Sequence, residues 1–137
     1  MKTIACLVVF FLLTTVTPVA AQARPKGHVR APKKTAVQYG TASYYANKFQ
    51  GRPMSGGALY DKNKMTCAHN SLPLGTWVKV TNLRNKKSVK VQVTDRLHHK
   101  NKRLVDLSRK AASKLGYVSR GLARVKLEVL KGNDIPR

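Results

Sequence analysis

Hydrophobic and polar residues alternate in short runs along much of this chain, a pattern typical of strands that bury one face. The clearest run covers residues 76–83, and residues 88–94 repeat the pattern after a polar connection at 84–87, which predicts a hairpin. Shorter runs of the same kind predict four further strands, at residues 37–46, 63–69, 104–107 and 122–130. Residues 50–57 are rich in glycine and are expected to form a loop.

One segment shows helix signals instead. Ser108 is a suitable N-cap, residues 109–115 favour a helix, and Gly116 fits the position just beyond a helix end. The order of the elements predicts one mainly β domain over residues 37–131, a six-stranded barrel with one short helix before its last strand. Residues 132–137 are expected to be a tail.

The N-terminus has the layout of a secretory signal peptide, which we assign to residues 1–23. A lysine precedes the apolar segment 4–16, and small residues at 21–23 form a cleavage site. A membrane anchor helix is the alternative for the same segment. Residues 24–36 are basic and contain proline, so a flexible arm is expected there. The cleaved chain would be periplasmic or secreted, with no membrane span.

Lysine and arginine outnumber the acidic residues by 27 to 5, and the formal net charge of the chain is +22. A field of this sign attracts polyanions, so nucleic acid, an anionic cell-wall polymer and an anionic lipid surface are all candidate partners by charge alone. Loss of the signal peptide would remove Cys6 and leave Cys67 alone, which excludes an intramolecular disulfide. Cys67 is expected to be a small buried residue.

Asp95 is the acidic residue most suited to chemistry. It ends the alternating run 89–94, where a strand leaves the sheet, and Arg96 and a polar loop follow it. Functional carboxylates often lie at such rims, so Asp95 is a candidate general acid or base. A strand-end aspartate paired with Arg96 is the structural alternative. Asp106 precedes the helix and either orients that segment or lines the same site.

Two kinds of histidine occur in the expected domain. His69 lies at the edge of an expected strand, where a hydrogen-bonded structural role and a catalytic role are equally open. His98 and His99 share a polar loop, but adjacent side chains rarely converge on one ion, so no metal site is expected.

Six motifs occur in a fixed order between residues 38 and 130. They are Gly40-Thr41-Ala42-Ser43-Tyr44-Tyr45, Gly56-Gly57-x-x-Tyr60-Asp61, Thr66-Cys67-Ala68-His69-x-x-Leu72-Pro73-Leu74-Gly75, Val78-x-Val80-Thr81-Asn82, Val93-Thr94-Asp95-Arg96 and Val105-Asp106-Leu107-Ser108. In this order and spacing they resemble the rare lipoprotein A (RlpA) family of septal lytic transglycosylases. The resemblance implies a double-psi β-barrel, the fold shared by expansin first domains and family 45 endoglucanases.

The resemblance also implies an activity, the endolytic cleavage of peptidoglycan glycan strands, preferably those lacking stem peptides, to 1,6-anhydromuramic ends. The family's catalytic positions correspond to Asp95, with His69 beside it. Asp106 is expected to line the same groove and, with Tyr45 and Arg96, to bind substrate. Tyr44 and Tyr45 point to opposite faces of a strand, so one belongs to the core and the other can stack on a sugar ring. A monomer without cofactor or nucleic acid is expected, with anionic wall polymers as further candidate partners.

A lytic transglycosylase suits a chain with few acids. Ordinary glycosidases need two carboxylates. Attack by the sugar's own 6-hydroxyl needs one group that protonates the leaving oxygen and then accepts the hydroxyl proton. Such an acid needs a raised pKa, which direct pairing with Arg96 would oppose. We therefore predict that the pKa of Asp95 is raised and that the Arg96 side chain points away from its carboxyl group.

The chain departs from the family pattern in three ways. Ala58 stands where many members have Glu, which predicts weakened turnover, and Leu97-His98-His99 replaces the usual Gly-Pro after Asp-Arg, which changes the groove wall. The sporulation-related repeat domain is missing from this sequence, and the basic surface is expected to substitute for it. A non-catalytic glycan-binding module is therefore the alternative function, and a secreted cationic protein acting on anionic lipid or nucleic acid is a third.

Overall fold

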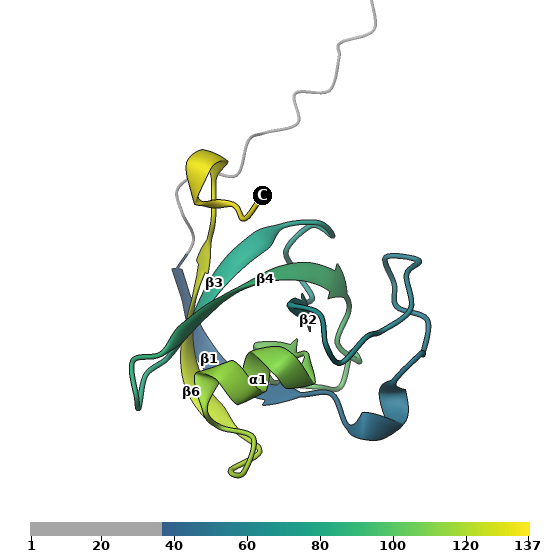
Figure 1. Ribbon diagram of the computed structural model, residues 1–137, viewed down its shortest axis with the longest axis horizontal. Helices are drawn as coiled ribbons and strands as arrows, with labels where there is room; N and C mark the ends of the chain where they lie inside the picture. Colours follow the sequence, from purple (N-terminus) through teal and green to yellow (C-terminus); the bar gives the residue numbers. More distant parts are fainter. Residues whose placement is uncertain (1–36) are drawn as a thin grey trace, which may run out of the picture. The chain divides into compact units, whose positions relative to one another are not determined.

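The computed structural model describes residues 37–137, which form six strands and one α-helix (Figure 1). The strands are β1 (Val37–Tyr44), β2 (Thr66–Ala68), β3 (Trp77–Asn82), β4 (Ser88–Asp95), β5 (Val105–Leu107) and β6 (Ala123–Val129). The helix is α1 (Arg109–Leu115), and two short 3-10 turns are η1 (Asn47–Phe49) and η2 (Gly132–Asp134). The predicted signal peptide 1–23 and arm 24–36 lie outside the described residues.

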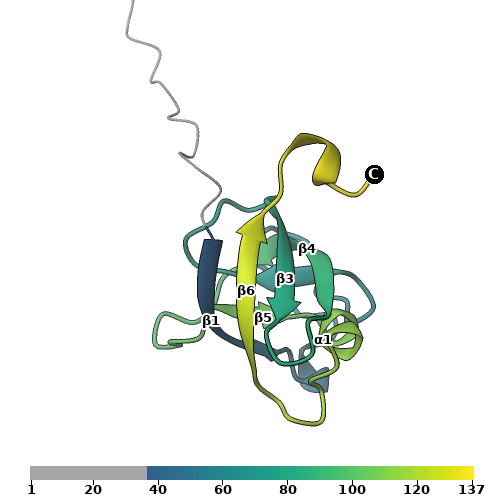
Figure 2. The same cartoon turned by 90° about the vertical axis from the view of Figure 1, so that its left-hand side faces the viewer.

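The six strands close into a barrel in the order β1-β5-β2-β4-β3-β6. Two neighbouring pairs are parallel, β1 with β5 and β2 with β4, and the other four pairs are antiparallel. Figure 2 shows β1, β6 and β3 side by side on one wall of the barrel. The predicted six-stranded barrel with one helix before the last strand is confirmed, and closure leaves no unpaired sheet edge.

The barrel interior is filled by the buried positions of the alternating runs. In β3, Val78, Val80 and Asn82 are buried while the residues between them are partly exposed, as the sequence pattern predicts. Val91 and Val93 face them from β4. Burying a valine side chain of this kind contributes about 1.5–3 kcal/mol of favourable transfer free energy.

The helix α1 packs against this core and carries both predicted caps. The Ser108 hydroxyl accepts a hydrogen bond from the Ala111 backbone N–H, and Gly116 takes the left-handed conformation with φ of 74°. The buried residues of α1 are Ala111, Ala112 and Leu115. The cap prediction is therefore confirmed at both ends of the helix.

Cys67 lies in the middle of β2 and is fully buried, as predicted. Burial raises the pKa of its thiol well above the ordinary range.

Beyond β6, the chain continues into η2, where the Lys90 ammonium donates to the backbone oxygen of Asp134. Within residues 37–137 we find no helix that is long and apolar enough to cross a membrane.

Candidate active site

A cleft of about 570 Å³ lies where β1 and β4 end. Its walls come from these strand ends, β5 and the loops around them, and they consist of Tyr44, Tyr45, Ala46, Phe49, Arg52, Pro53, Ser55, Ala68, Asp95, Arg96, Leu97, His98, Asn101, Arg103 and Asp106. Four of the five predicted site residues therefore meet in one cleft, namely Asp95, Asp106, Tyr45 and Arg96. The fifth, His69, does not line it.

The carboxylate of Asp95 accepts four hydrogen bonds. Oδ1 accepts from the Ser55 backbone N–H and hydroxyl, both at 2.9 Å, and from the Arg96 backbone N–H at 2.8 Å. Oδ2 accepts only from the Tyr45 hydroxyl, at 2.6 Å. Since each carboxylate oxygen has about two acceptor sites, Oδ2 is the atom with capacity left for a ligand.

These bonds decide the protonation state of Asp95. Burial of the carboxyl group acts to raise its pKa, but the hydrogen bonds from Tyr45, Ser55 and Arg96 outweigh burial, and the pKa is lowered. The prediction of a raised pKa is wrong, because the donors that the fold brings to Asp95 stabilise its charged form. Asp95 is a carboxylate at neutral pH.

Arg96 points away from Asp95, as predicted. Its guanidinium Nη1 donates to the backbone oxygens of His69 at 2.6 Å and of Leu72 at 2.7 Å. Within residues 37–137 the ion pairs are Arg103–Asp106 and Lys126–Glu128, and Asp95 takes part in neither. The Arg96 side chain thus holds the turn after β2 against the cleft wall.

His69 serves this same turn. Its buried ring accepts hydrogen bonds at Nδ1 from the backbone N–H groups of Ser71 and Leu72, both at 3.2 Å, and its Nε2 lies 3.2 Å from Gln38 Oε1. These partners assign the proton to Nε2. Burial, and then the charge of Arg96, lowers the pKa of His69, so the ring is neutral at pH 7.

The His69 ring lines a separate hollow of about 280 Å³ and not the Asp95 cleft. The link between the two residues runs through the backbone, since the His69 N–H donates to the Asp95 carbonyl oxygen at 3.1 Å. The expectation that this ring lies beside the Asp95 carboxyl group is therefore not met. The polar contacts of the His69 ring are with Gln38 and with the turn after β2.

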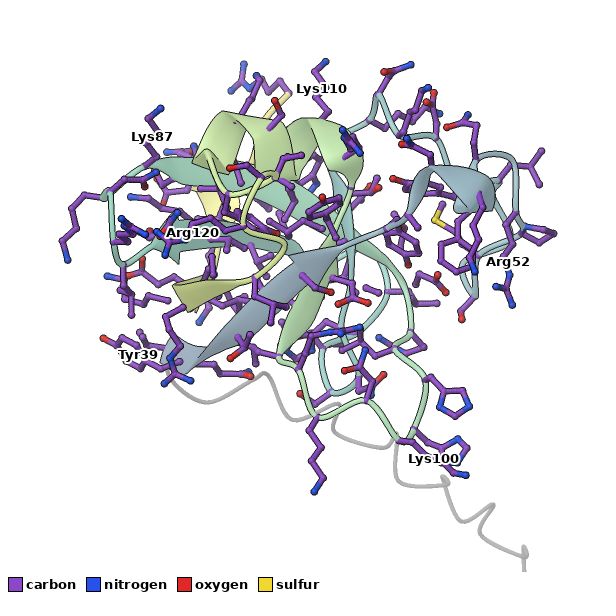
Figure 3. All side chains as sticks on the ribbon, turned by 90° about the horizontal axis from the view of Figure 1, so that it is seen from below. Tyr39, Arg52, Lys87, Lys100, Lys110 and Arg120 are labelled. Atoms are coloured by element: carbon purple, nitrogen blue, oxygen red, sulfur yellow. The ribbon has the colours of Figure 1, made fainter. Side chains whose placement is uncertain are left out.

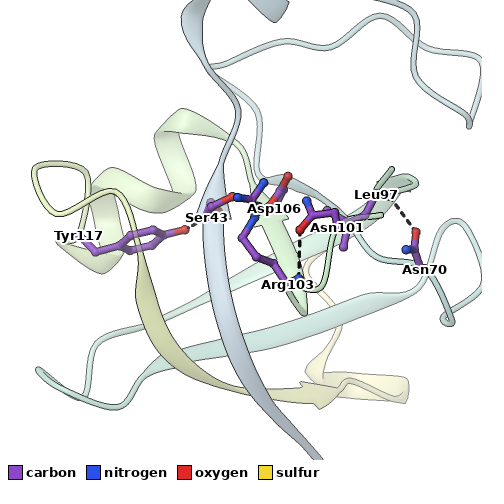
Figure 4. A network of polar contacts seen from close by, with 7 residues as sticks. All are labelled: Ser43, Asn70, Leu97, Asn101, Arg103, Asp106 and Tyr117. Atoms are coloured by element: carbon purple, nitrogen blue, oxygen red, sulfur yellow. Dashed lines mark hydrogen bonds and ion pairs between the residues drawn. The ribbon is translucent and has the colours of Figure 1, made fainter. Parts of the chain in front are cut away.

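Asp106 is held in the opposite wall by the network in Figure 4. Its Oδ1 accepts from the Ser43 hydroxyl and from Arg103 Nε, the latter at 3.2 Å. The Tyr117 hydroxyl donates to the Ser43 backbone oxygen at 2.8 Å, which ties the network to the segment after α1. Asn101 fixes the loop by accepting from the Arg103 backbone N–H at 3.0 Å.

The two neighbouring tyrosines both line the cleft, and Tyr44 in addition packs against the core. Tyr44 turns toward the core side, where its hydroxyl donates to the Val118 backbone oxygen at 2.8 Å. Tyr45 lines the cleft, but one face of its ring stacks on Tyr60 with centroids 4.4 Å apart. Burial, and then the bond to the Asp95 carboxylate, raises the pKa of Tyr45, so its phenol stays protonated and remains a donor.

Sequence patterns did not reveal Ser55, which supplies two of the four donors to Asp95. Ser55 lies on a narrow hairpin closed by the bridge between Pro53 and Leu59. The Gly56 N–H docks the hairpin on the Thr94 carbonyl oxygen at 3.0 Å. A Cβ at Gly56 would lie 2.8 Å from that oxygen, so only glycine allows this approach. No periodicity relates a glycine-rich turn to an aspartate forty positions later.

Ala58 lies on the same hairpin but lines a different hollow of about 310 Å³, formed with Gln92, Thr94 and the turn around Gly75. It does not line the Asp95 cleft.

The described part of the chain, 37–137, contains no cluster of three His, Cys, Asp or Glu side chains that could hold a metal ion.

Comparisons with known proteins identify the family of the chain and its fold. Residues 37–127 match the model of a family described as lytic transglycolase. A relative from Neisseria meningitidis serogroup A, named endolytic peptidoglycan transglycosylase RlpA, is 47% identical over 73% of this chain and 42% of its own length. A relative of the same name from Pseudomonas aeruginosa is 53% identical over 65% of this chain and 26% of its own. The chain thus spans less than half the length of these relatives.

Among solved structures, the apo expansin of Clavibacter michiganensis superposes with a TM-score of 0.56 and 25% identity, over 74% of this chain and 54% of the expansin. The Streptomyces papain inhibitor reaches a TM-score of 0.57 at 21% identity, over 70% of this chain and 96% of the inhibitor, which shows a common fold alone.

Proposed function

The chain belongs to the lytic transglycolase family, and we propose on this basis that it is an exported enzyme that cleaves peptidoglycan glycan strands to 1,6-anhydromuramic ends. The observation that carries the proposal is the carboxylate of Asp95, held on the wall of an open cleft with one oxygen available to a ligand. The printed activity of the relatives, endolytic transglycosylation of peptidoglycan, supplies the substrate class.

The reaction has a proton balance that one carboxylate can serve. The 6-hydroxyl oxygen of muramic acid attacks C1 of the same sugar, the bond from C1 to the glycosidic oxygen breaks, and the departing oxygen gains a proton. One proton therefore moves from O6 to the leaving oxygen, and no water is consumed. Because nucleophile and electrophile are in one sugar, the attack has a high effective molarity.

Asp95 starts this cycle as a base. Its ionised Oδ2 accepts the proton from O6 as that oxygen attacks, and the same carboxyl group delivers the proton to the leaving oxygen. The carboxylate is regenerated at the end of the turnover. Tyr45 and Ser55 hold the carboxyl group in place through their hydrogen bonds, and Tyr45 in addition keeps the negative charge stable before substrate binds.

The opposite wall binds the glycan. Asp106 offers a carboxylate to sugar hydroxyls from a position fixed by Ser43 and Arg103. Arg52 lines the cleft with an exposed side chain and lies over the ring of Phe49, at 5.2 Å from its centroid. Arg96 contributes by shaping the wall, since its Nη1 is already engaged with two carbonyl oxygens.

The deciding experiment uses purified sacculi, with and without prior removal of stem peptides by an amidase. We expect the purified protein to release anhydro-ended glycan fragments, detected by mass spectrometry, with more product from the amidase-treated sacculi. Asp95→Asn should abolish the release, because the amide cannot accept the O6 proton. Asp134→Asn removes an exposed carboxylate outside the cleft and should leave the yield unchanged. Equal product from Asp95→Asn and the unmodified protein would sink the proposal.

Ala58 raises the alternative of a glycan-binding module without turnover, but the relatives, which are named as transglycosylases, do not favour it. Many members of the family have Glu at this position, and here the side chain ends at Cβ beside Thr94. The same assay separates the two functions, because a binder pellets with sacculi without releasing fragments. A gain of product in Ala58→Glu would show that the alanine limits turnover.

A further inference from the structure

A second concave surface lies beside α1, and we propose that it binds the phosphate groups of an extended polyanion. This α1 pocket has a volume of about 690 Å³ and is lined by Asn47, Lys62, Asn63, Arg109, Lys110, Ser113 and Lys114. It shares no lining residue with the Asp95 cleft. Figure 3 shows Lys110 on α1 and Arg52 beside the cleft in separate parts of the molecule. The proposal does not depend on glycan cleavage.

The two walls of the α1 pocket are joined by backbone contacts. The Lys110 N–H donates to the Lys62 carbonyl oxygen at 3.0 Å, and the Arg109 N–H donates to the Tyr60 hydroxyl oxygen at 3.2 Å. The Arg109 guanidinium lies over the Tyr44 ring at 5.6 Å from its centroid. The cations on the two walls are therefore held near one another by the fold.

These cations have no acidic partner. All five acidic residues of the chain lie within residues 37–137, and none of their carboxylate oxygens forms an ion pair with the side chain of Lys62, Arg109, Lys110 or Lys114. The nearest acid in sequence, Asp61, accepts a hydrogen bond from the Asn63 backbone N–H instead. Four positive charges thus share one concavity with neutral polar side chains, one of which, Asn47, accepts from Arg109 Nη1 at 3.5 Å.

This arrangement costs stability in the free protein. Lys110 and Lys114 are four positions apart on α1, where like charges repel. A bound anion would offset this repulsion, and within residues 37–137 neither lysine has an acidic partner that does so.

The number of donors selects the kind of anion. One carboxylate has two oxygens and is satisfied by a single guanidinium, whereas this pocket offers four cations and three neutral polar side chains. A phosphate brings more oxygens and up to two charges, and the volume admits more than one phosphate. Among residues 37–137 the exposed large apolar residues are Val37, Tyr39, Leu59, Leu74, Leu122 and Ile135. None lines the pocket, so no side chain there inserts into a bilayer, and a chain of phosphates is favoured over a lipid surface.

The test titrates the purified protein with tripolyphosphate by calorimetry. The triple variant Lys62→Gln, Lys110→Gln, Lys114→Gln removes three pocket charges and retains helix propensity, because Lys and Gln have similar values. We expect binding to weaken about tenfold, as the loss of three exposed ion pairs implies. The control variant Lys86→Gln, Lys90→Gln, Lys131→Gln removes the same charge outside the pocket and should weaken binding about twofold or less.

Two further probes identify the source of the phosphate. Long-chain polyphosphate should bind more tightly than tripolyphosphate in a pocket-dependent manner, while phosphatidylglycerol vesicles should sediment the pocket variant and the control variant equally. A pocket-dependent loss of vesicle binding would assign the phosphates to lipid headgroups instead. Equal losses of tripolyphosphate binding in the two triple variants, or pocket-dependent binding of poly-glutamate with the same affinity, would overturn the proposal.

Discussion

Three of the four hydrogen bonds to the Asp95 carboxylate come from residues far away in sequence, Tyr45 and Ser55. Their combined effect exceeds that of burial and lowers the pKa of Asp95. A single residue thus has a protonation state that its sequence neighbours do not determine. In the proposed reaction this state makes Asp95 a base in the first step, whereas the family resemblance implied an acid with a raised pKa.

Tyr45→Phe tests this assignment at the level of one hydrogen bond. With the pKa of Asp95 lowered, the base form is present at neutral pH, and kcat/KM should fall only as the pH drops through that lowered pKa. Loss of the Tyr45 donor raises the pKa of Asp95, so the acidic limb of the pH–rate profile should move to higher pH. The profile is measured on amidase-treated glycan, with Tyr39→Phe as the matched control at an exposed tyrosine.

A rate that increases on acidification, in the unmodified protein as well as in Tyr45→Phe, would contradict the base role. That result would show that Asp95 acts as a protonated general acid, the role that the family resemblance implied.

At the scale of elements, the turn after β2 joins the His69 ring to the end of β4, where Asp95 and Arg96 lie. The His69 ring accepts hydrogen bonds from two backbone N–H groups of the turn, and the His69 backbone bonds to Asp95 and Arg96. The sequence placed His69 at the edge of a strand and left a structural and a catalytic role open. The contacts favour a structural role that acts on the cleft through the backbone.

His69→Ala should therefore lower the free energy of unfolding by about 1–3 kcal/mol, because two backbone donors lose their acceptor. The same variant should lower kcat without altering the shape of the pH–rate profile. His69→Asn returns a side-chain acceptor to the turn and should rescue both stability and activity in part. A catalytic imidazole predicts the reverse, namely loss of one limb of the profile and no rescue by asparagine. Thermal unfolding and steady-state kinetics provide the two measurements.

Local signals explain why some elements were predictable and others were not. The runs that became β3 and β4 and the caps of α1 were recognised because alternation and capping act within a few residues. The hairpin between Pro53 and Leu59 has a single bridge and no periodicity, so its role in holding Asp95 could not be read from its residues.

On the scale of the whole molecule, closure of the barrel depends on contacts between distant segments. The parallel pairs join β1 to β5 and β2 to β4, and β2 is enclosed between β4 and β5. Cys67, at the centre of β2, is fully buried. Its accessibility therefore reports on opening of the barrel as a whole.

We expect Cys67 to be inert to a thiol reagent in the native protein, because burial both hides the sulfur and raises the pKa of the thiol. Labelling should appear only with the cooperative unfolding transition in denaturant, when followed by mass spectrometry of the peptide that contains Cys67. Fast labelling under native conditions would show that β2 opens independently of the barrel. The control Cys67→Ala identifies any signal from other sites.

The sequence by itself determined the six strands, the capped helix, the family resemblance and the gathering of Asp95, Asp106, Tyr45 and Arg96 at one rim, because alternation, capping and motif order are properties of local sequence and spacing. Only the tertiary structure decided that Asp95 is ionised, that the His69 ring faces another hollow, and that basic residues of α1 and the loop at Lys62 share a pocket. Hydrogen bonds and charge interactions act over a few ångströms in space. Residues far apart in sequence come within this range of one another only once the barrel has closed.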